Sequence, residues 1–257
     1  MPRRPTLSPT KITTYLACPV KFRFTYKDSR GKWYMRAKSY YSFGTTLHRV
    51  LERFHDEGDI GVQTTDQAVA AMEESWIDAG FSSAEEMQEA FSEGKTILER
   101  YVNAAKDRPS NVHTLMVERM IKMPFPEFDL VGRVDRVDEH EDGTLEIVDY
   151  KSGRELVSEE DVRTDLAMCA YQLMLHHLYP DRGIRATIIA LRSGAEASYS
   201  LTQDERSEFA HDLEQLGLQI LRTEYDQLTP KPKELCRGCD FLPLCRTYPD
   251  FELLTTA

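Results

Sequence analysis

Apolar residues recur every three or four positions through much of the first hundred residues, which is the spacing of helices that bury one face. Ser8 followed by Pro9 is a typical helix start and predicts a helix that runs to about Ala17. A further apolar stripe predicts a helix over 43–55, with the members Leu47, Val50, Leu51 and Phe54. Two more helical stretches are expected, over 64–79 and 83–106.

The pattern then changes to shorter apolar runs, which are typical of strands. Strands are expected over 114–122, 128–138, 144–151, 185–192 and, more briefly, 197–201, with helices over 158–179 and 203–226 between and after them. The order of elements is thus helices, three strands, a helix, a strand and a helix. This order predicts an α/β fold in which helices flank one central mixed β-sheet. We expect a single domain over 1–257, divided into a basic N-terminal segment (1–43), a core (44–226) and a Cys-rich C-terminal segment (227–257).

Two acidic residues and a lysine stand on one predicted β-hairpin. Strand-like runs flank the polar turn 139–143, and pairing of Asp138 with Glu146 would place Asp135 opposite Asp149. Like charges so placed repel unless a cation lies between them. Lys151 projects from the same face as Asp149 because it is two residues further along the strand.

Such a group of two carboxylates and one ammonium can bind Mg²⁺ or Mn²⁺ and act on a phosphodiester. The alternative is a solvated face of an edge hairpin, because so short a pattern also occurs in unrelated proteins.

The composition is that of an ordinary soluble globular protein, with 41% apolar and 29% charged residues in 257. No apolar stretch approaches the roughly 20 residues of a membrane span. The first residues show no apolar run typical of a signal peptide. We therefore expect a cytoplasmic protein.

The net charge of −11 argues against a nucleic-acid partner, but its distribution argues for one. Residues 1–40 carry a net charge of +9 and the rest of the chain −20; the bases are Arg3, Arg4, Lys11, Lys21, Arg23, Lys27, Arg30, Lys32, Arg36 and Lys38. Aromatic residues interleave with them: Phe22, Phe24, Tyr26, Trp33, Tyr34, Tyr40, Tyr41 and Phe43. Bases that follow phosphates and rings that stack on nucleobases suit a single strand. The alternative is a basic arm whose aromatics belong to the core.

Three of the five cysteines are clustered in the tail, as Cys236, Cys239 and Cys245. This clustering indicates a metal site, for which Cys18 is the natural fourth ligand, whereas Cys169 is expected to be a small core residue. Zinc sites generally use two paired C-x2-C knuckles. One distant cysteine with three close ones fits a [4Fe–4S] cluster better, although four cysteines alone leave both metals open.

Two further polar residues have two interpretations each. His48 lies at the edge of its apolar stripe, so it is either a satisfied boundary residue or one that reaches a site on the sheet. Gln172 belongs to a polar lane on its predicted helix that is either a solvent face or the wall of a cleft; the other members are Asp165, Cys169, His176 and Tyr179.

Taken together, these motifs resemble the RecB-like branch of the PD-(D/E)xK nuclease superfamily over almost the whole chain, from Leu7 to Cys245. The matching elements are Cys18 after the first helix, Gly44-Thr45-Thr46-Leu47-His48, Gly132-Arg133-Val134-Asp135-Arg136, Asp149-Tyr150-Lys151, Gln172 and the three tail cysteines. The cysteine set is similar to the iron–sulfur members, which include the AddB nuclease domain, exonuclease V and nucleases of CRISPR adaptation.

The resemblance implies a restriction-endonuclease-like core and a DNA nuclease, by preference a single-strand exonuclease, of DNA repair, recombination or CRISPR adaptation. It implies that His48, Asp135, Asp149 and the carbonyl of Tyr150 bind Mg²⁺ or Mn²⁺, and that Lys151 and Gln172 also serve catalysis. Glu118 is a candidate further acid near the metals or a structural partner of a base. A [4Fe–4S] cluster is implied at a four-cysteine site that joins the two ends of the fold; its ligands are Cys18, Cys236, Cys239 and Cys245.

One position departs from the family pattern, because His176 stands where the family has a tyrosine, and Tyr179 lies one turn further on. The sequence contains no nucleotide-binding phosphate loop, so a helicase or a recombination or adaptation protein would be a separate partner. Two other functions remain open: a non-catalytic DNA-binding or adaptor protein, and a zinc-stabilised protein that binds RNA or another protein.

Overall fold

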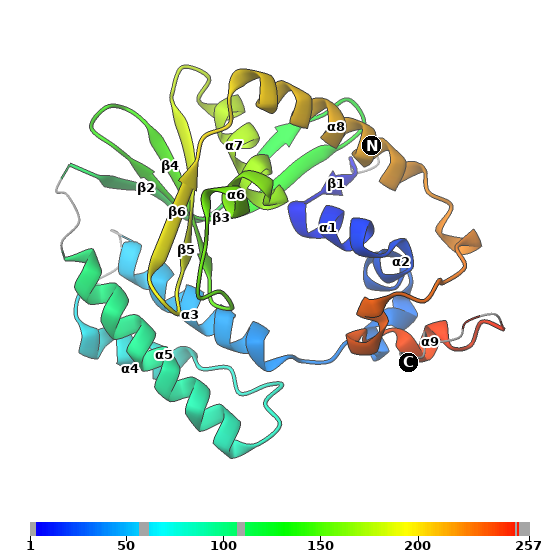
Figure 1. The fold of residues 1–257 in the computed structure, drawn as a ribbon, viewed down its shortest axis with the longest axis horizontal. Coiled ribbons are helices and arrows are strands. Elements are labelled where there is room, and N and C mark those ends of the chain that lie inside the picture. The colour runs from blue at the N-terminus through cyan, green and yellow to red at the C-terminus, as the bar shows by residue number, and fades with distance from the viewer. Residues whose placement is uncertain (1–3, 57–61, 107–110, 250, 252–257) are drawn as a thin grey trace.

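A six-stranded mixed β-sheet with helices on both faces forms the body of the protein (Figure 1). The computed structural model describes residues 4–56, 62–106, 111–249 and 251; Arg3 of the predicted basic set lies outside them. One face of the sheet packs against α1 (Pro9–Ala17), α7 (Leu166–Leu178) and α8 (Gln203–Arg222). The other face packs against α3 (Ser39–His55), α4 (Thr65–Ser75) and α5 (Ala84–Ala105). The predicted central mixed sheet flanked by helices is confirmed.

The strands run in the order β1-β3-β4-β5-β6, and β2 pairs with the other side of β3. Their bounds are β1 Thr6–Leu7, β2 His113–Pro124, β3 Asp129–Glu139, β4 Leu145–Lys151, β5 Ile184–Ala190 and β6 Ala195–Tyr199. Consecutive strands from β2 to β4 are antiparallel, whereas β4 and β5 are parallel and are joined by a helical crossover. This crossover brings the ends of β4 and β5 to the same edge of the sheet.

The hairpin of β3 and β4 has the predicted register, with Asp138 opposite Glu146. Its turn closes at Gly143, whose φ of 84° lies in the left-handed region that favours glycine. The ladder continues to Arg136 opposite Val148, so Asp135 and Asp149 are next in line. There the Tyr150 amide donates to Asp135 Oδ2 at 2.9 Å, so the Asp135 carboxylate accepts from a backbone amide near the end of β4.

The first helix of the other layer, α3, begins four residues earlier than the predicted start at 43. Its buried side, which includes Phe43, Leu47 and Val50, packs against Val148 of the sheet, as the apolar stripe predicts. The extra turn was not predicted because it adds no buried apolar side chain: Tyr40 and Tyr41 are exposed and the buried Ser42 is polar. Its N-cap position, Lys38, makes no side-chain capping bond.

The predicted helix over 158–179 is two helices, because Asp165 adopts an extended conformation and caps the second one. The first is α6 (Glu159–Thr164), and Asp165 accepts from the amides of Ala167 and Met168 at the start of α7. The polar lane is therefore not a continuous helical face. Cys169 and Gln172 are both buried, so the lane is not a solvent face there either.

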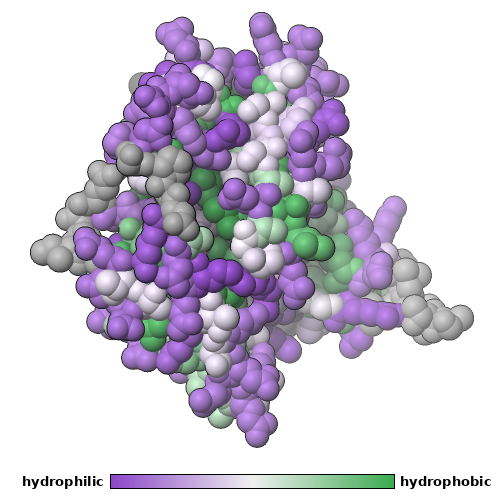
Figure 2. All heavy atoms as spheres, turned by 60° about the vertical axis from the view of Figure 1, so that its left-hand side comes forward, coloured by the Kyte–Doolittle hydropathy of each residue, from purple (hydrophilic) through white to green (hydrophobic). Residues whose placement is uncertain are grey.

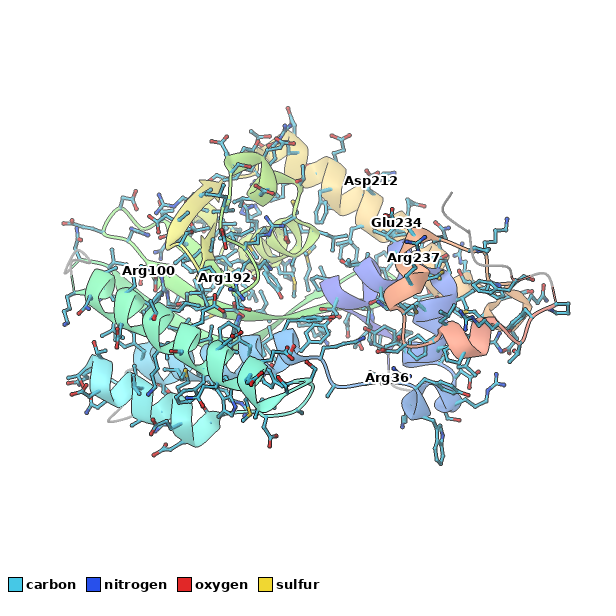
Figure 3. All side chains as sticks on the ribbon, turned by 60° about the horizontal axis from the view of Figure 1, so that its bottom comes forward. Arg36, Arg100, Arg192, Asp212, Glu234 and Arg237 are labelled. Carbon is cyan, nitrogen blue, oxygen red and sulfur yellow. The ribbon has the colours of Figure 1, made fainter. Side chains whose placement is uncertain are left out.

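The two ends of the chain build a small module beside α1, to the right in Figure 1. Its elements are α2 (Pro19–Tyr26), η1 (Ser29–Trp33), η2 (Tyr225–Gln227), η3 (Glu234–Gly238) and α9 (Leu242–Cys245). Val20 and Phe24 pack with Phe241 and Leu244 in its core. Much of the basic, aromatic stretch over 27–43, for which the sequence pattern predicts a loop, is helical, in η1 and in the first turn of α3. Arg36 lies on the connection from this module to α3 (Figure 3).

The surface is mainly hydrophilic on the face shown in Figure 2, where apolar side chains gather in the middle. Among the residues that the structure describes, no helix has the length and apolar character needed to cross a membrane.

Candidate active site

Three carboxylates form a row across neighbouring strands, from Glu118 on β2 through Asp135 on β3 to Asp149 on β4. The pairs on either side of Glu118, Val117 with Arg136 and Arg119 with Val134, place it opposite Asp135. Asp149 follows on the other side of Asp135, in continuation of the β3–β4 register. Side chains that face each other across strands lie about 5 Å apart, so this row concentrates negative charge.

His48 of α3 completes this group. Its Nδ1 lies 3.4 Å from Asp135 Oδ2 and 3.7 Å from Glu118 Oε1, and its Nε2 lies 3.0 Å from the Tyr150 carbonyl oxygen. One ligand atom from each of His48, Glu118 and Asp135 lies within 4.8 Å of the others, so the three residues can hold a metal ion. The Tyr150 carbonyl contacts His48 itself, and its role as a metal ligand stays a prediction.

Gly44 explains how α3 brings His48 so close to the sheet. A Cβ at this position would lie 2.8 Å from Ser152 Oγ, in the segment directly after Lys151. Only a residue without a side chain allows this approach without a shift of Ser152. His48 lies one helical turn further along the same face, and it is therefore held against the end of β4.

Lys151 and Asp149 form an ion pair at the end of β4, with 2.7 Å between Nζ and Oδ2. Burial raises the pKa of Asp149 to about 6, and the negative charge of Asp135 adds to this effect. Burial alone would lower the pKa of Lys151, but the adjacent Asp149 outweighs it and raises the pKa. The lysine is therefore a cation at neutral pH.

The pKa of His48 reports the same accumulation of acids. Burial alone would lower it, but hydrogen bonds to Asp135 and Glu118, with the charges of Asp135 and Asp149, raise it to about 10. The imidazole is therefore protonated at neutral pH and donates both of its protons. A positive charge thus already stands beside the acid row.

Glu118 combines an uncommon backbone conformation with an ion pair to Arg133. Its φ of 46° is the only left-handed value among the described residues other than glycine, and such a conformation is uncommon within a strand. Arg133 Nε lies 2.5 Å from Glu118 Oε2, so both interpretations of Glu118 hold: it pairs with a base and it belongs to the metal-competent group.

The structure does not bring Gln172 to this group. Its side chain is 1% exposed, and its Oε1 accepts from the Leu201 amide at 2.9 Å. The preceding residue, Tyr171, faces the site instead, because its ring lies over Gly132, where a Cβ would meet Tyr171 Cε1 at 2.5 Å. Gly132, which belongs to the sequence motif around Asp135, was the sequence signal for this close approach of Tyr171 to β3.

An open cavity of about 1030 Å³ covers the site. It is lined by one face of α3, which includes Tyr41, His48 and Glu52, and by Glu118, Asp135 and Lys151 from the strands. Neither His176 nor Tyr179 lines it; Tyr179 lines a different cavity, on the far side of Glu52.

Behind the site, a buried network supports β4. The Tyr150 side chain points to the opposite face from Asp149, where its hydroxyl lies 2.5 Å from Arg136 Nη1 and 2.8 Å from the Tyr101 hydroxyl. Arg136 is itself paired with Asp138, with 3.0 Å between Nε and Oδ2. Arg136 belongs to the sequence motif around Asp135, but this supporting role was not predicted.

The four predicted cysteine ligands come together in the core of the terminal module, and none forms a disulfide. Burial, together with the other three thiols of the set, raises the pKa of Cys245 to about 12. Backbone amides of Lys21 and Lys233 donate to the sulfurs of Cys18 and Cys236, at 3.4 and 3.3 Å. The buried Cys169 stands apart, as predicted.

Comparison with known proteins gives one extended match. The family model of the PD-(D/E)XK nuclease superfamily matches residues 6–246. No curated protein matches the chain.

Two solved structures are similar over most of their length. The crystal structure of SSO0001 has 16% identity and a TM-score of 0.36, over 79% of this chain and 84% of that one. A crystal structure from Eubacterium rectale, named a "putative exonuclease", has 13% identity and a TM-score of 0.39, over 84% and 94% of the two chains. At these TM-scores neither structure carries an argument.

Proposed function

Because the chain belongs to the PD-(D/E)XK nuclease superfamily, we propose that it is a metal-dependent deoxyribonuclease that hydrolyses phosphodiester bonds. The observation that carries this proposal is the convergence of His48, Glu118 and Asp135 next to the Asp149–Lys151 pair, within one open cavity. Nucleases of this superfamily use divalent metals, and the carboxylates of Glu118 and Asp135 are ligands that suit Mg²⁺ or Mn²⁺.

Each side chain of this site has its own role in the proposed hydrolysis. His48, Glu118 and Asp135 would hold a divalent cation, which would supply positive charge to the phosphate and lower the pKa of a bound water. Asp149, predicted as a further metal ligand, also holds the Lys151 ammonium at 2.7 Å. Lys151 lines the cavity, where its ammonium can donate to a phosphate oxygen and stabilise the charge of the transition state.

We propose single-stranded DNA and DNA ends as the substrate, cut from an end by preference. Support comes from the basic N-terminal segment, which leads into the cavity through α3. DNA repair, recombination and CRISPR adaptation are the processes in which such a module would serve, with a separate helicase, recombination or adaptation protein as partner.

We also propose that Cys18, Cys236, Cys239 and Cys245 hold a [4Fe–4S] cluster. Support comes from the convergence of these four cysteines in the core of the terminal module, since a four-iron cluster binds four cysteine thiolates. Such a cluster would be structural here, since it would fasten α2 to the tail of the chain.

The decisive experiment is cleavage of end-labelled single-stranded DNA with Mn²⁺ or Mg²⁺ by the wild type and by Asp135→Asn. We expect metal-dependent cleavage that falls by at least about a hundredfold in the variant, because charge stabilisation at such a site contributes several kcal/mol. The ladder from each labelled end then gives the polarity of cleavage.

A matched control is Glu127→Gln, which removes an exposed carboxylate from the turn between β2 and β3 and should leave cleavage unchanged. If cluster-loaded wild-type protein binds DNA but never cleaves it, the protein is a non-catalytic adaptor and the proposal is wrong.

A further inference from the structure

Two exposed tyrosines stand at the mouth of the active-site cavity. Tyr40 is 60% and Tyr41 66% exposed, and their ring centroids lie 4.4 Å apart with the planes tilted by 46°. Both line the cavity, together with Met120 of β2, which is also 60% exposed. Large apolar side chains that gather at a cavity mouth mark a binding surface.

The other aromatics of the N-terminal segment are not available for this purpose. Phe22, Phe24 and Phe43 are buried in three different cores. Trp33 is 87% exposed, but it does not line the cavity, and neither do Tyr26 and Tyr34. The stacking function predicted for this segment therefore narrows to Tyr40 and Tyr41 at the catalytic cavity.

The spacing along α3 relates the two rings to the metal-competent group. Tyr41 and His48 share the cavity-lining face and are seven residues apart, which is about 10 Å along a helix axis. A strand with its bases stacked advances about 3.4 Å per nucleotide, so this distance spans about three nucleotides. A base within a few nucleotides of a phosphate at His48 therefore reaches the rings.

Charge on either side of the rings favours one path for the strand. On the catalytic side the cavity is lined by four bases, Arg49, Arg133, Lys151 and Arg154, and by three acids, Glu52, Glu118 and Asp135, of which the last two belong to the metal-competent group. Beyond Tyr40, a second cavity of about 460 Å³ carries three acids, Glu86, Glu89 and Glu93, and one base, Arg192. Bases outnumber acids on the first side and acids outnumber bases on the second, so the first side is the more favourable one for phosphates. The rings thus stand where a nucleic-acid path would end.

We propose that Tyr40 and Tyr41 form a stacking platform for unpaired bases of the strand whose phosphate is cleaved, and that this platform selects single strands over duplexes. The proposal rests on the proposed nuclease function and names its substrate-selecting residues. Bases in a duplex cover one another's faces and cannot stack on the rings without being unpaired.

The test measures binding in a Lys151→Ala background, in which the strand is not cut. Labelled single-stranded DNA and a duplex of the same sequence are titrated with this parent, with added Tyr40→Ala and Tyr41→Ala, and with added Tyr40→Phe and Tyr41→Phe. We expect the Ala pair to weaken single-strand binding about 5- to 140-fold for each stacked base, with duplex binding unchanged. The Phe pair keeps the rings and should stay within about twofold of the parent.

Trp33→Ala is the matched control, since it removes an exposed ring outside the cavity and should leave single-strand binding unchanged. The platform is refuted if the Ala pair binds single strands like the parent, or loses single strands and duplexes equally. It is also refuted if Trp33→Ala loses as much as the Ala pair. Wild-type protein that does not act on DNA at all refutes the nuclease function itself, whereas wild-type cleavage with an unaffected Ala pair refutes the platform alone.

Discussion

At the scale of single residues, the proton of His48 stands where a metal ion is expected. The row of Glu118, Asp135 and Asp149 needs a positive charge, and the protonated imidazole supplies one. A metal ion that binds Nδ1 must displace a proton from this ring. Proton and metal therefore compete for one place.

This competition predicts a pH dependence of metal binding. The pKa of His48 is raised to about 10, so the ring stays protonated throughout pH 7 to 8.5, and Mg²⁺ affinity should rise about tenfold per pH unit. Calorimetry in two buffers of different ionisation enthalpy should record the release of about one proton. Glu118→Gln removes one carboxylate that holds this proton, so binding should weaken and its pH dependence should become shallower. An affinity that is constant over this range would contradict the competition.

Sequence patterns identify the residues whose chemistry is tied to a local motif. The structure places His48 beside Asp135 and Lys151 beside Asp149, because helical and strand periodicity fix which face each occupies. The part played by Glu118 depends on the register of β2, which shifts between Thr114 and Met116. No local pattern announces such a shift, so the place of this acid could not be derived.

At the scale of elements, the close contact of β3 with α7 depends on the absence of a side chain at Gly132. Gly132→Ala would place a methyl group 2.5 Å from the Tyr171 ring, and we expect a loss of about 1–3 kcal/mol in the free energy of unfolding. Urea denaturation measures the loss, and it should shrink in a Tyr171→Ala background. Gly153→Ala is the matched control, because nothing lies within 4 Å of its Cβ position. Equal losses for the two glycines would contradict the close packing.

The existence of nearly every helix and strand in the core follows from periodicity, but two boundaries do not. The helix break at Asp165 depends on a side chain that caps α7 rather than continuing α6, and Asp is compatible with either. The first turn of α3 is stabilised without apolar residues facing the core, so it leaves no periodic signal. Gln172 shows the same limit, since its buried partner is the backbone of Leu201.

At the scale of the whole molecule, the site formed by Cys18, Cys236, Cys239 and Cys245 brings the first and last parts of the fold together. Cys18→Ser should lower both the iron content and the thermal unfolding temperature of anaerobically purified protein, since closing so long a loop is where a cross-link contributes most. Cys169→Ser is the matched control, because this buried cysteine lies outside the set and should retain the iron. Brown protein with about four iron atoms per chain is expected. Colourless protein that contains zinc would contradict the cluster.

The order in which the chain is synthesised determines when the four cysteines can come together. Cys18 leaves the ribosome more than two hundred residues ahead of Cys236, and the hairpin that carries Asp135 and Asp149 emerges between them. Domains tend to fold as they emerge, so the acid row can assemble while Cys18 still lacks its partners. The proposed cluster could then be loaded only into chains that have been synthesised at least as far as Cys245. Under this proposal, a shortage of iron would leave chains with a folded core and an open terminal module.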